Sequence, residues 1–204
     1  MVNNLDTACS YLEIDGKVIG PHKPTYFIAE AGLNHNTDIK LAKKLIEEAH
    51  NCGADAVKFQ DYRTEDFLSD SKLTYTYDSQ GTKITETQWD IFKRYEPESS
   101  WWPQLKELCE KLNIAFFATP TSEDRVRDLV KTGVPLLKNG SDYLTHTPLL
   151  EYMGRTGVPV IASTGMADQQ DVDDAVEAVA QGVGQIAVVH FDKLGVRKIS
   201  VGCA

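Results

Sequence analysis

The chain has 204 residues, of which 42% are hydrophobic and 25% are charged, and its formal net charge is −9. This length fits one domain of ordinary size, or one large domain with a short accessory piece. The acidic balance argues against a protein that binds the nucleic-acid backbone, because such proteins need a clustered basic face. We therefore expect no nucleic-acid partner.

The sequence also lacks the signals of a membrane or secreted protein. No segment reaches the roughly 18 consecutive apolar residues that a membrane helix requires. Residues 1–10 have neither the cationic start nor the apolar run of a secretory signal. We predict a soluble, cytoplasmic protein with no membrane partner. The four cysteines are scattered without a C-x-x-C pair, which fits neither a disulfide framework nor a zinc site.

The first predicted element is a β-hairpin. Two short β-prone runs in residues 11–20 flank Asp15-Gly16, a dipeptide that tolerates the positive φ angles of a type I′ turn. Pro21 and Pro24 then interrupt regular secondary structure before the next apolar run. The hairpin therefore reads as a short N-terminal extension.

Short apolar runs alternate with amphipathic helical stretches along the rest of the chain. The predicted strands are residues 26–29, 56–60, 114–119, 134–139, 158–163 and 186–190. The predicted helices are a stretch that begins after Asp38 and ends before Gly53, and residues 86–95, 101–112, 123–131, 148–155 and 169–180. Residues 61–85 are polar and turn-rich and are predicted to form a long loop.

This alternation indicates an α/β protein with parallel strands joined by right-handed crossovers. An open doubly wound sheet and a closed (β/α)₈ TIM barrel both fit it. Polar residues follow five consecutive strands, and a barrel gathers all its strand ends around one mouth. No G-x-G-x-x-G follows the first strand, which weakens the dinucleotide-binding alternative. We predict a barrel that is incomplete, because only about six strands are present where a full barrel takes about 250 residues.

Two lysines at strand ends predict an anion site. Lys58 and Lys138 each stand in an apolar strand context. One such lysine could simply extend its ammonium group past the strand end into water. Two of them around one mouth favour binding of phosphate or carboxylate. The hydroxyl groups of Thr119, Ser141 and Ser163 could donate hydrogen bonds to the same oxygens.

Glu30 ends the first strand between two alanines. A carboxylate in an apolar setting needs a partner, so an ion pair with Lys58 is one interpretation. The other is proton handling beside the substrate. Gln60 shares the face of Lys58 by the period of the strand and could contact a neutral polar substrate such as a sugar. No spacing of His, Asp and Glu resembles a metal site, so we predict no metal ligand in this chain.

Five motifs, in this order, resemble the N-acetylneuraminate (sialic acid) synthase family, which includes legionaminate, pseudaminate and spore-coat polysaccharide synthases. They are FIAEAGLNHN at residues 27–36, GADAVKFQ at 53–60, FFATP at 116–120, LKNGSD at 137–142 and STGM at 163–166. Together they run from about residue 27 to about residue 190. The co-occurrence of five motifs makes the resemblance specific.

The resemblance implies a (β/α)₈ barrel that condenses phosphoenolpyruvate with an N-acetylated hexosamine, such as N-acetylmannosamine, to give a sialic-type acid and phosphate. In that family the residues matching Glu30, Lys58 and Lys138 serve the reaction. Those that hold phosphoenolpyruvate match Lys58, Thr119, Lys138, Ser141 and Ser163. Those on the sugar side match Gln60 and Glu30. Asp142 is assigned to the sugar side as well, one position earlier than the acid that many members carry.

The resemblance ends at His190. A divalent metal, usually manganese, polarises the sugar aldehyde in the family, and its ligand histidines lie on strands without a counterpart here. The C-terminal antifreeze-like domain, which crosses the family's homodimer, also has none. We therefore assign residues 1–26 to the hairpin extension, 27–190 to a partial barrel and 191–204 to a divergent tail. A truncated enzyme of low or no activity is expected.

Two other functions fit the same residues. A non-catalytic module could keep the phosphate or phosphoenolpyruvate site and have lost the chemistry. A different phosphate-binding barrel aldolase would use Lys138 or Lys58 to form a Schiff base with its substrate.

Overall fold

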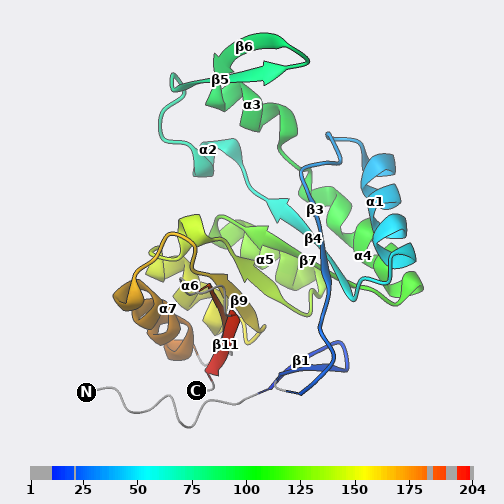
Figure 1. The fold of residues 1–204 in the computed structure, drawn as a ribbon, viewed down its shortest axis with the longest axis vertical. Helices are drawn as coiled ribbons and strands as arrows, with labels where there is room; N and C mark the ends of the chain where they lie inside the picture. The colour runs from blue at the N-terminus through cyan, green and yellow to red at the C-terminus, as the bar shows by residue number, and fades with distance from the viewer. Residues whose placement is uncertain (1–10, 21, 183–185, 192–196, 203–204) are drawn as a thin grey trace.

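The computed structural model describes residues 11–20, 22–182, 186–191 and 197–202, with the backbone alone for 187–191 and 197–202. Strands alternate with helices along the chain (Figure 1). The parallel strands are β3 (Ile28–Gly32), β4 (Ala56–Asp61), β7 (Ala115–Pro120), β8 (Leu137–Asn139), β9 (Val160–Ser163) and β10 (Ile186–Phe191). The larger helices are α1 (Ile39–Asn51), α3 (Gln88–Tyr95), α4 (Trp102–Leu112), α5 (Glu123–Thr132), α6 (Thr147–Arg155) and α7 (Gln169–Gln181).

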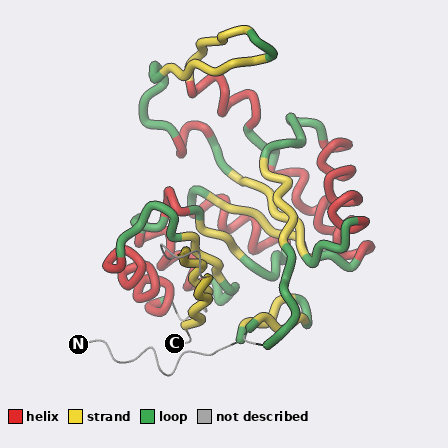
Figure 2. The backbone as a smooth tube through the Cα atoms, viewed as in Figure 1, coloured by secondary structure: helices red, strands yellow, loops and turns green. Residues whose placement is uncertain are grey.

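The parallel strands follow one another in space in the order of the chain. β3, β4 and β7 form one hydrogen-bonded sheet, and β8, β9 and β10 belong to another. β7 and β8 pack side by side, although the ladder is interrupted between them. The helices lie outside the strands (Figure 2). The predicted α/β class is confirmed, and each of the six predicted strands overlaps an observed strand, although β3 lies at Ile28–Gly32 where residues 26–29 were predicted.

The described residues do not form a closed barrel, and the incomplete (β/α)₈ barrel expected from the sequence stays a prediction. The sheet of β3, β4 and β7 ends at β3, and the other sheet ends at β11 (Arg197–Gly202). β11 pairs antiparallel with β10, with Ile186 opposite Gly202. Closure needs strand pairs between these two edges, and none exists in the part of the chain that the structure describes.

The N-terminal hairpin predicted from Asp15-Gly16 is present. β1 (Leu12–Ile14) pairs antiparallel with β2 (Lys17–Ile19), and both turn residues have positive φ angles, 47° and 77°. Leu12 and Ile14 are 1% exposed and belong to the main core. The hairpin therefore packs its apolar face against the body of the protein.

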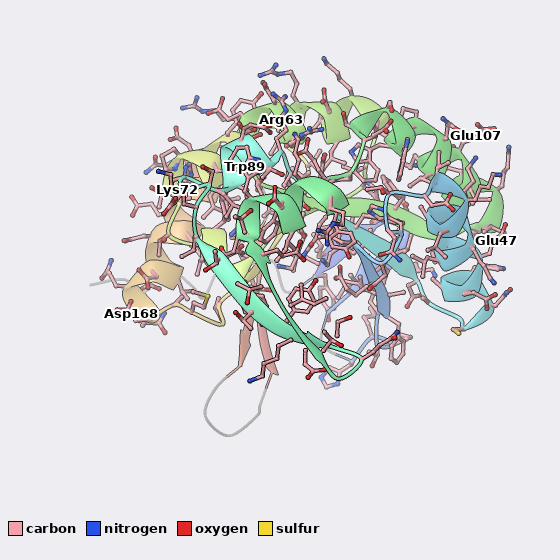
Figure 3. All side chains as sticks on the ribbon, turned by 90° about the horizontal axis from the view of Figure 1, so that it is seen from above. Glu47, Arg63, Lys72, Trp89, Glu107 and Asp168 are labelled. Atoms are coloured by element: carbon pink, nitrogen blue, oxygen red, sulfur yellow. The ribbon has the colours of Figure 1, made fainter. Side chains whose placement is uncertain are left out.

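The long loop predicted for residues 61–85 is wrong in part. A short helix, α2 (Thr64–Phe67), and an antiparallel hairpin of β5 (Thr74–Ser79) and β6 (Thr82–Thr87) lie in or extend from this segment. Threonine and tyrosine alternate in β5, and Gln80-Gly81 supplies the positive φ angles of the turn. The polar side chains made this segment resemble a loop in the sequence. The hairpin of β5 and β6 lies above the ends of the parallel strands (Figures 1 and 3).

The core between β4, β7 and α4 is aromatic. Phe59, Phe116 and Trp102 are all 0% exposed, and their ring centroids are 5.8–6.0 Å apart. Rings at such distances pack efficiently and add to the stabilisation from burial. This packing fixes α4 against the outer face of β4. None of the described helices has the length and apolarity needed to cross a bilayer.

The turn between β3 and α1 is strained. Asn36 and Thr37 have φ angles of 47° and 57°, in the left-handed region that a β-branched residue rarely adopts. The buried His35 ring stabilises this turn, because its Nδ1 accepts a hydrogen bond of 3.1 Å from the Thr37 amide. Burial also lowers the pKa of His35, which favours the neutral ring that this bond requires.

Replacing Thr37 by glycine should raise the free energy of unfolding by about 1 kcal/mol, because glycine adopts a positive φ angle without the steric cost of a Cβ atom. Urea denaturation of the wild type and Thr37→Gly measures the difference. Thr25→Gly is the matched control, because Thr25 is exposed and has no positive φ angle. Equal effects of the two substitutions would show that Thr37 is not strained.

Candidate functional site

The carboxyl ends of β3, β4 and β7 bring four of the predicted site residues together. Lys58 and Gln60 lie on one face of β4, by the period of the strand. In the sheet Lys58 is opposite Glu30 of β3, and Gln60 is opposite Thr119 of β7. Because parallel strands all end at the same edge, these residues line one rim of the sheet.

Lys58 is the centre of this group. Its Nζ forms an ion pair with the Glu30 carboxylate and donates a hydrogen bond of 3.4 Å to Thr119 Oγ1. The side chain of Lys58 is 14% exposed, whereas that of Glu30 is 50% exposed. The ion pair with Lys58 foreseen for Glu30 is therefore present. Because half of the Glu30 side chain is exposed, its carboxylate is accessible from solvent.

Lys138, at the end of β8, adds a second cation. Its Nζ donates a hydrogen bond to the carbonyl oxygen of Asn139. Burial lowers the pKa of Lys138 to about 8; the positive charge of Lys58 also lowers it, while Asp142 and Glu30 act in the opposite direction. Two ammonium groups thus repel each other in a partly buried place. A bound anion would relieve both the repulsion and the cost of burial.

The loops after β8 and β9 meet beside Lys138. Ser141 Oγ lies 3.5 Å from the position that a Cβ atom would take on Gly165. An oxygen of Asp142 lies 2.2 Å from the corresponding position on Gly140, so a larger residue cannot replace this glycine without a shift of the carboxylate. Ser163 ends β9 and is half-buried at the same rim.

The structure therefore groups the predicted residues to different degrees. Glu30, Lys58 and Thr119 are in direct contact. Lys138 and Asp142 lie within electrostatic range of this group. Ser141 adjoins the loop that follows Ser163, and Gln60 is placed by its register alone. The expected role of each residue stays a prediction.

Two contacts near the site were not predicted. Phe67 of α2 stacks on Tyr143, with ring centroids 6.2 Å apart and an interplanar angle of 11°. On the other face of β4, Asp61 is completely buried against Arg125 and Trp102. The period of the strand could have indicated the burial of Asp61, because Asp61 lies on the face of β4 opposite to Lys58 and Gln60, the face that packs against the helices. No sequence signal indicated the aromatic stack.

Metal ligation has no support among the described side chains. No group of three or more His, Cys, Asp or Glu residues there is close enough to hold a metal ion. The residues at the strand ends are instead two cations, one hydrogen-bonded hydroxyl and two carboxylates, a set that suits an anion with a polar co-substrate.

The family model of the NeuB family matches residues 45–192 of this chain. The chain is 35% identical over 160 residues to N,N'-diacetyllegionaminic acid synthase of Legionella pneumophila. The match covers 78% of this chain and 45% of that protein. It is 32% identical over 180 residues to spore coat polysaccharide biosynthesis protein SpsE of Bacillus subtilis, with 87% and 47% covered. The chain spans about half the length of the curated relatives it matches.

A solved structure agrees with these relatives. N-acetylneuraminic acid (sialic acid) synthetase of Leptospira borgpetersenii is similar with a TM-score of 0.77 at 30% identity, over 90% of this chain and 59% of that chain. A truncated 3-deoxy-D-arabino-heptulosonate 7-phosphate synthase of Thermotoga maritima has a TM-score of 0.62 at 13% identity, which supports the fold alone. The family resemblance predicted from the five motifs is confirmed.

Replacing Lys138 by methionine should stabilise the protein by about 3 kcal/mol at pH 7. The folded state lowers the lysine pKa from 10.5 to about 8, so the unfolded state binds this proton more tightly. Wild-type stability should therefore rise with pH between these values, and the advantage of Lys138→Met should vanish above them. Urea denaturation at pH 7 and pH 10.5 measures both effects.

The matched control is Lys111→Met, because the Lys111 side chain is 67% exposed on α4. It should leave the stability nearly unchanged at both pH values. A Lys138→Met variant less stable than the wild type at pH 7 would mean that the contacts of Lys138 outweigh the cost of burying its charge.

Proposed function

Because the chain belongs to the NeuB family of sialic-type acid synthases, we propose that its strand ends bind phosphoenolpyruvate for condensation with an N-acetylated hexosamine. The observation that carries this proposal is that Lys58 and Lys138 both lie at strand ends, near enough for the charge of Lys58 to lower the pKa of Lys138. Phosphoenolpyruvate carries a phosphate and a carboxylate, so its charge matches two cations at one rim. The products are a nonulosonic acid and phosphate.

Binding of the phosphoenolpyruvate anion is assigned to the side chains at the carboxyl ends of the parallel strands. Lys58 and Lys138 neutralise the anion, and the hydroxyl groups of Thr119, Ser141 and Ser163 donate hydrogen bonds to its oxygens. Preorganised donors of this kind also stabilise the charge that builds up on the departing phosphate. The largely buried position of Lys58 beside Thr119 supports this assignment, since their 3.4 Å contact holds the ammonium group at the strand end.

The sugar side is assigned to Glu30, Gln60 and Asp142. In the proposed reaction, C3 of phosphoenolpyruvate forms a bond to the aldehyde carbon of an N-acetylmannosamine-like sugar. Water then adds at C2, and the C2–O bond to phosphate breaks, which leaves the 2-keto acid. Glu30 is close enough to Lys58 to lie beside the bound anion, and its exposed half can accept a proton or orient the water.

We propose further that this chain is a partial barrel of low or no activity. Phe27 and Ile28 are 62% and 37% exposed at the outer edge of β3, where the described residues provide no further strand. Parallel strands are normally buried on both sides, so among the described residues Glu30 lacks cover on this side. A homodimer, a cytoplasmic location and the family's manganese requirement stay expectations for the whole enzyme.

Binding of phosphoenolpyruvate tests the proposal first. Isothermal titration calorimetry should detect binding at pH 7, with an affinity that falls by up to about tenfold per unit as the pH rises above the lysine pKa of about 8. The anion raises the pKa of Lys138, so titrations at pH 8 in buffers of different ionisation enthalpy should show proton uptake. Lys138→Met should lose the uptake, whereas Lys111→Met should bind like the wild type. Absence of wild-type binding would refute the proposed site.

Turnover tests the proposed low activity separately. Phosphate release from phosphoenolpyruvate with N-acetylmannosamine and Mn²⁺ should be absent or at trace level for this chain. Robust release would contradict the low activity expected from the open edge at β3. A Glu30→Gln variant would then determine whether the release comes from this site or from a contaminant.

One observation favours a second candidate function. A lysine pKa of about 8 leaves a useful fraction of neutral amine at Lys138, which is what a Schiff-base aldolase requires. Borohydride trapping with a keto acid would attach the substrate to Lys138 if this reading holds. A non-catalytic phosphoenolpyruvate-binding module is the remaining alternative, and it shares the binding result but none of the turnover.

A further inference from the structure

The end of β4 presents different side chains to its two sides. Lys58 and Gln60 face the proposed anion site, whereas Phe59 and Asp61 face the helices and are 0% exposed. A fully buried carboxylate on the helix side is unexpected in a strand whose other outward residues are apolar. The polar partners of the Asp61 side chain are Trp102 and Arg125, neither of them a predicted site residue, so its effect on the site passes through the end of β4.

Asp61 joins four elements at this point. Its Oδ2 accepts a hydrogen bond of 3.0 Å from the indole Nε1 of Trp102 in α4. Its Oδ1 lies 3.4 Å from an Nη atom of Arg125 in α5, within ion-pair range. Its backbone oxygen accepts a hydrogen bond of 3.2 Å from the amide of Thr121, just after β7. The end of β4 is thereby fastened to α4, α5 and β7.

This buried network is costly and only partly satisfied. Asp61 Oδ1, Arg125 Nε and the hydroxyl oxygens of Thr121 and Ser122 are buried without a hydrogen-bond partner in the part of the chain described. Buried ion pairs seldom add stability over an apolar replacement of similar volume, because both charges lose their hydration. A role other than stability would explain why a carboxylate and a guanidinium occupy this place.

The network acts on the two residues that hold each other at the rim. Lys58 lies three residues before Asp61, and Thr119 lies two residues before Thr121. The hydrogen bond between Asp61 and Thr121 therefore closes the β4–β7 ladder just beyond the contact of Lys58 with Thr119. Loosening this end would separate the ammonium group from the hydroxyl group.

We infer that Asp61, held by Arg125 and Trp102, is a positioning residue that fixes Lys58 and Thr119 at the distance needed to bind the anion. This inference rests on the proposed binding of phosphoenolpyruvate. Misplacement of a binding group by about 1 Å costs one to two orders of magnitude, so the effect should be measurable.

The charge of Asp61 should matter as well as its shape. Burial raises the pKa of Asp61 to about 7; Arg125, the Trp102 hydrogen bond and Arg63 act in the opposite direction, and Asp128 adds to the rise. The carboxylate that pairs with Arg125 is therefore fully formed only above neutral pH. Below neutral pH the wild type should behave like a variant without this charge.

The experiment compares wild-type protein with Asp61→Asn, which keeps an acceptor for Trp102 but cannot ionise. Phosphoenolpyruvate affinity is measured by calorimetry from pH 6 to pH 8.5. The ratio of the two dissociation constants cancels the titration of the ligand and of Lys138. We expect Asp61→Asn to bind about tenfold more weakly at pH 8 and nearly as well as the wild type at pH 6. A ratio of one, or one that does not change with pH, would overturn the inference.

Two further variants keep the test decisive. Asp61→Leu/Arg125→Met removes both buried charges, so it should fold even if Asp61→Asn does not, yet bind about tenfold more weakly. Wild-type affinity in this folded double variant would also overturn the inference. Glu107→Gln removes a carboxylate that points outward from α4 (Figure 3) and should bind normally. If the wild type itself does not bind, the proposed function fails first, and the positioning role fails with it.

Discussion

The candidate site depends on two partly buried cations, Lys58 and Lys138: burial first, and then the repulsion from Lys58, disfavours the charged form of Lys138. Each occupies the end of a parallel strand, and the strands hold them within electrostatic range. Glu30 pairs with Lys58, and Asp142 lies near Lys138, so the protein offsets part of the excess charge itself. The positive charge that is not offset favours binding of an anion. A fold that keeps two like charges together gives up stability for binding.

Much of the fold could be predicted because buried parallel strands carry strong local signals. The apolar runs at β3, β4, β7, β8, β9 and β10 were each recognised from the sequence. The hairpin of β5 and β6 was not, because its threonine and tyrosine residues read as a polar loop and little of it is buried. The antiparallel pairing of β11 with β10 was not predicted either, because the sequence of this segment carries no clear strand pattern.

The candidate site divides in the same way. A simple rule, that polar residues at the ends of parallel strands converge, selected Lys58, Thr119 and Lys138 correctly as neighbours. The rule does not predict contacts between a strand and the helices packed against it. Asp61 and Arg125 are 64 positions apart in the sequence, and only the packing of α5 against the strands brings them together. Such pairs have no local signature.

The two sides of the proposed site differ in how completely this chain forms them. The anion side is built from β4, β7, β8 and β9, and Lys58 there is shielded by neighbours on both sides. The sugar side includes Glu30, on an edge strand, with half its side chain in solvent. Water screens the ion pair of Glu30 with Lys58 and weakens it. Cover on the open side of β3 would exclude water and strengthen that ion pair, so the proposed proton handling by Glu30 depends on such cover more than the proposed anion binding by Lys58 does.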